Sequence, residues 1–252
     1  MKNHQQVVTR QFGEQANAYL NSNVHAQGAE FAQLQALVTP HPQARVLDLG
    51  CGAGHVSFHV APLVAEVTAY DLANDMLTVV AQAAQDKGLS NIVTAQGMAE
   101  QLPFTAATFD FVFSRYSAHH WQDVGQALRE IKRVLKPGGQ VVFIDVCAPG
   151  LPLLDTYLQT VEVLRDPSHV RDYSVAEWAR LLGEAGLQVQ QQHTQKLTLA
   201  FQSWVTRMRT PKVMQDAILA LQQAMGNEVR DYFAIQPEGT FNTDVLVIQA
   251  QA

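Results

Sequence analysis

The sequence predicts an α/β fold in which a doubly wound parallel sheet carries helices on both faces. Between Ala44 and Val146, short apolar runs rich in β-branched residues alternate with longer segments of helical period. Strands that alternate with helices form βαβ units, and right-handed crossovers stack these units into a parallel sheet. The first run leads directly into a cluster of glycines, and the second ends at Asp71. Ligand sites of such sheets lie at these carboxyl ends of the strands.

The elements follow in order along the chain. Five strands are predicted at residues 45–49, 66–70, 91–95, 109–113 and 140–146. Helical spacing precedes them at residues 6–20 and 25–38, and the second helix ends before Pro40 because proline cannot continue a helix. After a break at Pro149 and Gly150, the predicted elements are helices at 152–164 and 174–184, a strand at 187–193, a mostly helical segment at 202–225 and a last strand at 244–249.

The chain length predicts one large domain. A chain of 252 residues can bury a sizeable core, and domains commonly contain about 100 to 200 residues. We expect a single domain over residues 1–252, with a core at about residues 40–148. A helical lid at residues 1–38 and cap and carboxyl-terminal elements at residues 149–252 complete this prediction.

The charge balance argues against nucleic acid as a partner. Lys and Arg number 17 and Asp and Glu 23, a net charge of −6, so the chain lacks the positive field on which binding to a phosphate backbone depends. Cys51 and Cys147 stand far apart and outside any CxxC spacing, which suits a reducing compartment. The polar amino terminus resembles no signal peptide, and no apolar run reaches the roughly 18 residues of a membrane span. We therefore expect a cytoplasmic protein.

The segment VLDLGCGAG at residues 46–54 joins the first strand to a helix. Glycines at alternate positions permit positive φ and remove the Cβ atoms that would keep a ligand away from the backbone. We expect the amides of the helix start to be left unpaired and to favour an anionic group. The spacing is GxGxG, which differs from the GxGxxG of dinucleotide folds. Asp71, at the end of the second strand, can accept hydrogen bonds from a ribose diol.

Two further segments reach the same edge of the predicted sheet. GMAEQLPF at residues 97–104 follows the third strand, and SRYSAHHW at residues 114–121 follows the fourth. Because the carboxyl ends of parallel strands meet at one edge, all four segments should converge on one ligand site. The run LKPGG at residues 135–139 is interpreted as a helix stop and a turn that starts the fifth strand, with a structural role.

Taken together, VLDLGCGAG, Asp71, AEQLPF, FDFVFSR and LKPGG resemble the class I S-adenosylmethionine-dependent methyltransferases. Among these enzymes the sequence is most similar to the ubiquinone and menaquinone C-methyltransferase branch, also described as methyltransferase type 11. The resemblance covers about residues 12–146, and residues 244–249 match the final strand. It implies a Rossmann-like, seven-stranded, mostly parallel sheet with an antiparallel last strand and helical cap elements.

The resemblance also implies the cofactor S-adenosyl-L-methionine and the product S-adenosyl-L-homocysteine. Residues expected at the cofactor are Tyr19, Asp48, Gly50, Cys51, Gly52, Gly54, Asp71, Leu72, Met76, Met98, Ala99, Glu100, Ser114 and Arg115. Asp48 and the glycines would line the methionine part, and Asp71 would hold the ribose hydroxyls. Met98 departs from the pattern, because such enzymes commonly have an Asp there that accepts from the adenine amino group. A thioether gives soft contact to the ring, but that hydrogen bond is lost.

Methyl transfer from a sulfonium is an in-line displacement, so the protein mainly has to align the acceptor with the methyl group in a dry site. His119 and His120 follow the fourth strand at the mouth of the predicted site. We hypothesise that one of them orients or deprotonates the acceptor. The alternative is that one stacks on Trp121 and the other faces solvent. Consecutive side chains diverge and no metal-ligand spacing is nearby, so we expect no metal.

Specificity for the acceptor should come from the segments added to the minimal fold. These are residues 151–174 and the amino-terminal helix, both of which we expect over the carboxyl edge of the sheet. The candidate residues for the acceptor site are Tyr116, Tyr157, His169, Arg171 and Tyr173. An anionic acceptor would have to be held by local groups such as Arg115 or Arg171, because the acidic chain exerts no long-range attraction on it.

The sequence therefore predicts a methyltransferase that acts on a small, uncharged or anionic organic molecule. A catalytically silent S-adenosylmethionine-binding regulatory protein is the first alternative, with Met98 as its sign. A dinucleotide-dependent oxidoreductase is disfavoured by the glycine spacing. An RNA or protein methyltransferase is disfavoured by the acidic charge balance and by the lack of a base-reading Asn-Pro-Pro-Tyr motif.

Overall fold

The computed structural model describes residues 3–13 and 28–252. The strands are β1 (Arg45–Leu49), β2 (Glu66–Asp71), β3 (Ile92–Gln96), β4 (Phe109–Arg115), β5 (Leu135–Cys147), β6 (Gln188–Leu199) and β7 (Phe241–Gln251). The helices are α1 (His4–Gly13), α4 (Ala29–Val38), α5 (His55–Val60), α6 (Asn74–Asp86), α7 (Val124–Val134), α8 (Pro152–Arg165), α9 (Val175–Glu184), α10 (Phe201–Arg207), α11 (Lys212–Ala224) and α12 (Asn227–Tyr232), with short 3-10 turns η1 (Ala61–Leu63) and η2 (Ala118–His120).

Among the described residues the strands form one seven-stranded sheet in the order β3-β2-β1-β4-β5-β7-β6. The first five strands run parallel, whereas β7 is antiparallel to both β5 and β6. The Rossmann-like, doubly wound sheet with an antiparallel last strand is therefore confirmed. The strand order reverses between β1 and β4, so their carboxyl ends open a crevice of the kind that binds ligands.

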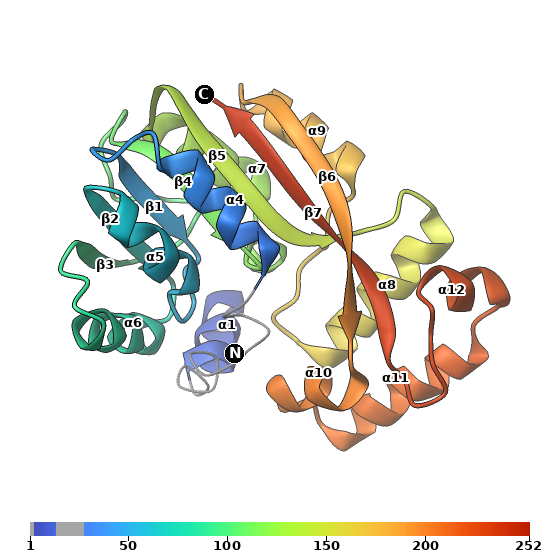
Figure 1. The fold of residues 1–252 in the computed structure, drawn as a ribbon. Coiled ribbons are helices and arrows are strands. Elements are labelled where there is room, and N and C mark those ends of the chain that lie inside the picture. The colour runs from blue at the N-terminus through green and yellow to red at the C-terminus, as the bar shows by residue number, and fades with distance from the viewer. Residues whose placement is uncertain (1–2, 14–27) are drawn as a thin grey trace.

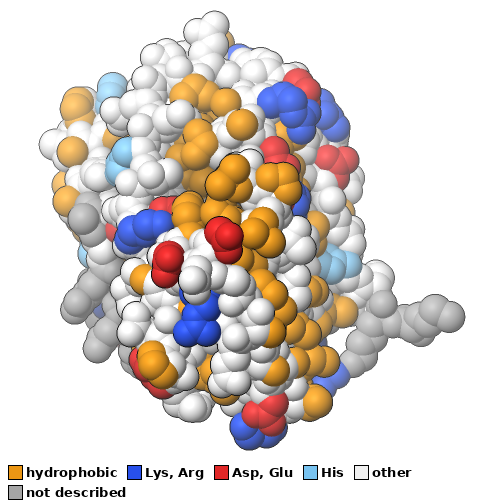
Figure 2. Space-filling view, turned by 90° about the vertical axis from the view of Figure 1, so that its right-hand side faces the viewer, with side chains coloured by type: hydrophobic (Ala, Val, Ile, Leu, Met, Phe, Trp, Pro, Cys, Tyr) orange, Lys and Arg blue, Asp and Glu red, His pale blue; other side chains and the backbone are white. Residues whose placement is uncertain are grey.

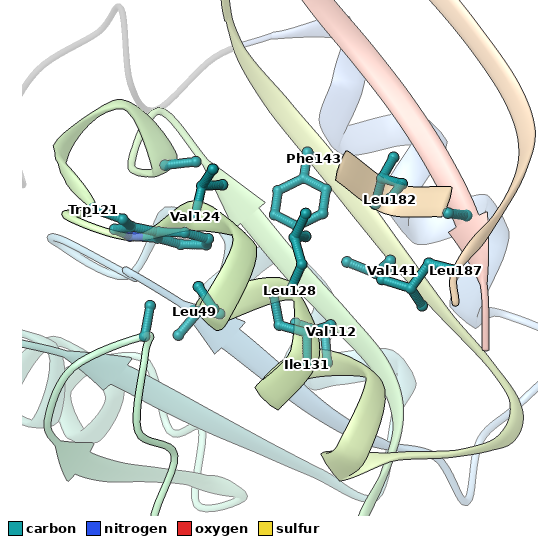
Figure 3. Close-up of a cluster of buried hydrophobic side chains, with 14 of the residues drawn as sticks. Leu49, Val112, Trp121, Val124, Leu128, Ile131, Val141, Phe143, Leu182 and Leu187 are labelled. Atoms are coloured by element: carbon teal, nitrogen blue, oxygen red, sulfur yellow. The ribbon is translucent and has the colours of Figure 1, made fainter. Parts of the chain in front are cut away.

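Helices cover both faces of the sheet (Figure 1). On one face, α4 and α5 pack their apolar residues on β1, β4, β5 and β7, and α6 covers β2 and β3. On the other face, α7 and α9 bury a second cluster. Figure 3 shows Leu128 and Ile131 of α7 pointing into this cluster beside Val112 and Phe143 of the sheet. The helical spacing of these apolar residues explains why α7 forms there, and the Asp123 carboxylate caps it by accepting from the Gln126 amide.

The carboxyl-terminal helices have a core of their own at one end of the sheet. Tyr157 of α8, Trp204 of α10 and Phe233, which follows α12, are buried there together with Phe241 of β7. Figure 2 shows scattered hydrophobic and charged side chains on the side of the molecule that carries these helices, and no extended field of Lys and Arg. In the described part of the chain, no helix combines the length and the apolar character needed to span a bilayer.

Several element boundaries differ from the predicted ones, and three cases are informative. The run LKPGG is not a separate turn but the start of β5, where Leu135 pairs with Phe109 before the register shifts. The helical segment at 202–225 is divided into α10 and α11, because Pro211 lacks an amide and Arg209 has a φ of 51°. The predicted helix at 6–20 is observed as α1, and its residues after Gly13 lie outside the described part of the chain.

Truncation of Leu128 tests the core beneath α7. This side chain is fully buried, so Leu128→Ala should lower the free energy of unfolding by about 2 to 5 kcal/mol through lost transfer energy and a residual cavity. Arg129→Ala is the matched control, because Arg129 is exposed on the same helix, and it should change stability by less than about 0.5 kcal/mol. Urea unfolding curves measure both values. Equal effects of the two substitutions would contradict this packing.

Candidate functional site

A pocket lies at the carboxyl ends of β1, β2, β3 and β4, where the sequence predicts a ligand site. The turns after these strands form its floor, and α1 lies against it from the amino terminus. Figure 1 shows α1 at this end of the sheet, where it also contacts α6. The space inside the pocket, its open mouth included, is about 1110 Å³.

Most of the predicted cofactor residues meet in this pocket. Its lining includes Asp48, Gly50, Cys51, Gly52, Asp71, Leu72, Met76, Met98, Ala99, Glu100 and Arg115. Gly54 and Ser114 do not line it. Gly54 packs against Val80 of α6, and the buried Ser114 hydroxyl has no hydrogen-bond partner among the described residues. Tyr19 lies outside the described residues.

The glycine turn approaches the pocket with its backbone. Gly50 and Gly52 have φ values of 70° and 50°, a region that side chains other than glycine rarely adopt. A Cβ on Gly50 would collide with the hydroxyl of Ser117, so this glycine is needed for close packing. A Cβ on Gly52 would meet no atom within 4 Å and would occupy the pocket itself. Gly52 therefore keeps space open for a ligand.

Two carboxylates stabilise this turn and its surroundings by accepting hydrogen bonds. Asp48 is 1% exposed and accepts from the amide and the hydroxyl of Ser57 at 2.9 and 2.6 Å. Burial raises the pKa of Asp48 to about 7, although the two Ser57 hydrogen bonds act in the opposite direction. Asp71 accepts from the amides of Gly52 and Ala73, both at 2.9 Å. Burial also raises the pKa of Asp71, and these amides partly offset the increase.

The prediction that the amides of the helix start are left unpaired for an anion is wrong for the Ser57 amide, and amides of the preceding turn are paired as well. The Ser57 amide donates to Asp48 and the Gly52 amide to Asp71. The amides of Gly50 and Cys51 both donate to the carbonyl of Tyr70. The reason is that buried carboxylates require donors, and these amides are the donors within reach. The floor of the pocket is consequently acidic.

The site contains a group of residues that the sequence reasoning missed. His4, Gln5, Val8 and Phe12 of α1 line the pocket. His4 Nε2 donates to the His120 carbonyl at 3.0 Å, and the Phe12 ring meets the His120 ring edge-on with centroids 4.9 Å apart. The helical face at residues 6–20 was a signal for this helix, but spacing alone does not say which edge of the sheet a terminal helix contacts.

Arg115 forms a buried ion pair with Glu30. Its side chain, 6% exposed, lies 2.8 Å from the Glu30 carboxylate and stacks at 4.7 Å on the rings of both Phe31 and Tyr116. Tyr116 follows with a φ of 52°, a strained conformation that turns the chain at the edge of the pocket. Burial raises the pKa of Tyr116 to about 12, so its phenol stays protonated. Arg115 is thus a neutralised part of the wall.

The two adjacent histidines have different environments. The His119 Nδ1 atom lies 2.6 Å from the Asp145 carboxylate. Burial by itself lowers the pKa of His119, but the charge and hydrogen bond of Asp145 outweigh it and raise the pKa to about 9. His120 lines the pocket, and its Nδ1 lies 3.0 Å from the Ser168 carbonyl. Burial, together with the His119 cation whose ring centroid is 4.1 Å away, lowers the pKa of His120 to about 3.

The tautomer of His120 follows from its partner. A carbonyl oxygen can only accept, so Nδ1 carries the proton and donates it to Ser168. The other ring nitrogen, Nε2, then carries a lone pair, and no described residue hydrogen-bonds to it. Trp121, against which one histidine was expected to stack, packs on Phe143 instead. The pocket therefore presents a neutral imidazole that can accept a hydrogen bond.

Of the residues predicted to contact an acceptor, only Tyr116 lines the pocket. Tyr157 is buried against Phe233 in the carboxyl-terminal core, and Tyr173 packs on Trp178 of α9. His169 hydrogen-bonds to the Gln159 side chain, and Arg171 is paired with Asp155 and Glu177. These four side chains therefore build the scaffold of the cap. Neither Arg115 nor Arg171 is left available to hold an anionic acceptor, because carboxylates already neutralise both.

Among the described residues, no group of three or more His, Cys, Asp or Glu side chains is placed to hold a metal ion. The polar groups that line the pocket are carboxylates, imidazoles, amides and backbone groups. A pocket of this kind, over the carboxyl edge of a Rossmann-like sheet, defines a protein that binds a cofactor with a nucleoside part.

Comparison with known proteins names the family. Residues 47–143 match the methyltransferase domain model. The chain is 54% identical to YafE of Escherichia coli over 80% of this chain and 97% of that one, and 30% identical to a malonyl-[acyl-carrier protein] O-methyltransferase of Salmonella typhimurium over 83% and 79%. The crystal structure of YcgJ from Bacillus subtilis superposes with a TM-score of 0.86 at 34% identity, over 91% of this chain and 98% of YcgJ.

The chain belongs to the class I S-adenosylmethionine-dependent methyltransferases, in the branch that the sequence predicts. Its cofactor is S-adenosyl-L-methionine. The residues present fit this molecule: an acidic floor at Asp48 suits a cationic amino acid part, and Asp71 suits a ribose diol. Leu72 and Met76 supply an apolar wall for a base, and the open space at Gly52 admits the cofactor close to the backbone.

A pair of glycine substitutions tests this cradle. Gly52 and Gly88 both have positive φ and open space at the Cβ position, but Gly88 is exposed at the end of α6. Gly52→Ala and Gly88→Ala should each lose about 1 to 2 kcal/mol of stability from backbone strain. Only Gly52→Ala should weaken the binding of S-adenosylhomocysteine, by about tenfold or more, because its methyl group enters the pocket. Calorimetric titration measures the affinity, and an unaffected Gly52→Ala would place the cofactor elsewhere.

The His119–Asp145 pair should make stability depend on pH. The folded pKa of His119, about 9, lies above its ordinary value of 6.5, so its stabilisation is complete below pH 6.5 and is lost as pH rises through 9. We expect the loss of this stabilisation to lower the free energy of unfolding by up to about 3 kcal/mol as pH rises. In His119→Gln the free energy of unfolding should fall less between pH 6.5 and 9, whereas His193→Gln, an exposed control on β6, should keep the full decline. Denaturant melts at several pH values decide between these outcomes.

Proposed function

We propose that this chain transfers the methyl group of S-adenosylmethionine to a small, uncharged organic acceptor by in-line displacement. The observation that carries the proposal is the neutral His120 imidazole on the pocket wall, with Nδ1 bound to Ser168 and its lone pair on Nε2. An imidazole in this state accepts a hydrogen bond from a hydroxyl or another weakly acidic donor. His120 would therefore orient the acceptor.

The low pKa of His120 supports the orienting role over the role of a base. A group with a pKa of about 3 has little affinity for a proton at neutral pH, so it is a weak general base. His120 would contribute by positioning, since a hydrogen-bond acceptor at a fixed place can align a nucleophile with a methyl group. His119 and Asp145 act behind it, because the cation beside the His120 ring keeps that ring neutral.

The walls of the pocket favour an acceptor without charge. Val8, Phe12 and Trp121 are apolar, and Arg115, which also lines the pocket, is paired with Glu30. The malonyl-[acyl-carrier protein] relative is named for an acceptor with a carboxylate. In this chain Arg115 and Arg171 are both neutralised by carboxylates, so we propose an uncharged acceptor instead.

The cofactor supplies an electrophilic methyl group when it is bound, and the chain supplies the surroundings. Asp48 and the glycine turn would hold its methionine part and Asp71 its ribose. Helix α1 would exclude water, since Phe12 stands beside His120 at the pocket edge. We also propose that the whole chain is one domain, with α1 as its lid and the helices after Gly150 as its cap. The two cysteines are buried free thiols, which supports the predicted cytoplasmic location.

The proposal is tested with His120→Phe, which keeps an aromatic ring but removes the acceptor nitrogen. Methyl-labelled S-adenosylmethionine and a panel of uncharged phenols, enols and alcohols would identify an acceptor through label transfer. On that acceptor, His120→Phe should lower kcat by about 100-fold and leave the affinity for S-adenosylhomocysteine within about threefold. His193→Phe, at an exposed position on β6, should leave both values unchanged.

Two results would count against the proposal. Unchanged turnover in His120→Phe would remove the orienting role. Tight binding of S-adenosylhomocysteine without label transfer to any acceptor in a broad panel would favour the cofactor-binding regulatory protein instead.

A further inference from the structure

The loop after β3 forms one end of the pocket, next to Asp71, and several of its acceptors are already engaged. The Met98 carbonyl accepts from the Tyr70 hydroxyl at 3.1 Å and from the Gln101 amide at 3.2 Å. The Glu100 carboxylate accepts from the amides of Gln122 and Asp123 through Oε1. The side chain of Met98 is a thioether, which accepts hydrogen bonds only weakly. The Met98 side chain therefore offers a base mostly apolar contact.

Gln5 of α1 places its side-chain amide beside Met98 of this loop. Its Nε2 atom donates to the sulfur of Met98, and both residues line the pocket. The carboxamide oxygen of Gln5 has no hydrogen-bond partner in the described part of the chain. An amide held by one nitrogen to a sulfur presents its oxygen beside that sulfur, so a strong acceptor stands where the loop has a weak one.

The pocket runs from the glycine turn after β1, past Asp71 after β2, to Met98 after β3. With the ribose diol at Asp71, the base of the cofactor would lie on the β3 side, where Leu72 and Met98 line the pocket. We propose that Gln5 recognises the adenine base by accepting a hydrogen bond from its exocyclic amino group. Helix α1 thus supplies base specificity to a site whose loop lacks it.

The experiment compares two ligands, S-adenosylhomocysteine and its analogue with unsubstituted purine in place of adenine. If one hydrogen bond to the amino group is made, wild type should bind the adenine compound about fivefold more tightly. Gln5→Leu should lose this preference, and Gln5→Glu should keep or increase it because a carboxylate remains an acceptor. Calorimetric titration of wild type and each variant with each ligand gives this comparison without any need for a methyl acceptor.

Gln6→Leu is the matched control. Gln6 is exposed on the same helix turn, and its Oε1 accepts from the Asn3 amide at 3.1 Å. This substitution loosens the first turn of α1 without touching the pocket, and it should keep the fivefold preference. A preference for adenine that persists in Gln5→Leu would overturn the proposal, because another group would then bind the amino group. Loss of the preference in Gln5→Glu would overturn it as well, since that variant retains an acceptor at the same position.

Discussion

The site depends on two carboxylates, one buried and one half-buried, that need hydrogen-bond donors. Asp48 of β1 is buried and Asp71 at the end of β2 is half-buried, and removal from water makes an unsatisfied carboxylate costly. The donors within reach are the amides of Ser57, Gly52 and Ala73, and these bonds fix the path of the chain from β1 into α5. Positive φ values at Gly50 and Gly52 make that path possible. The same bonds leave an acidic floor, which suits a cationic cofactor and repels an anionic one.

A second electrostatic arrangement shapes the opposite wall. Asp145 of β5 also accepts from the Ala118 amide at 2.9 Å, so it both positions the turn after β4 and pairs with His119. The charge on His119 is stabilised there, and the same charge disfavours a second proton on His120. One residue of the adjacent pair is therefore a structural cation and the other a neutral acceptor. Adjacent positions in the sequence suggest that the two histidines are equivalent. They differ because His119 pairs with Asp145 and His120 hydrogen-bonds to Ser168.

Sequence patterns predicted the parts of the molecule that are governed by local physics. Strand and helix periods located the sheet, and alternating glycines located the turn at Gly52. Contacts between distant segments were beyond such patterns. The sequence suggests a free cation at Arg115, but Glu30, 85 positions earlier, pairs with it. Similarly, Gln5 contacts Met98 across 93 positions. The split of residues 202–225 at Pro211 was open to local reasoning, because proline lacks the amide that a continuous helix requires.

The amino-terminal helix α1 depends on tertiary contacts for its stability and position. A helix of ten residues is marginal in water by itself, and no side chain of α1 is fully buried. Its position comes from packing against α6, where Phe12 lies beside Met76, and from contacts at the pocket edge: Gln5 with Met98, His4 and Phe12 with His120, and Gln11 with the Met208 carbonyl at 2.8 Å. Two of these anchors lie on pocket loops and one on the carboxyl-terminal helices. The residues that hold α1 in place are thus largely the residues that line the cavity, so the arrangement of this helix and the integrity of the site depend on the same few contacts.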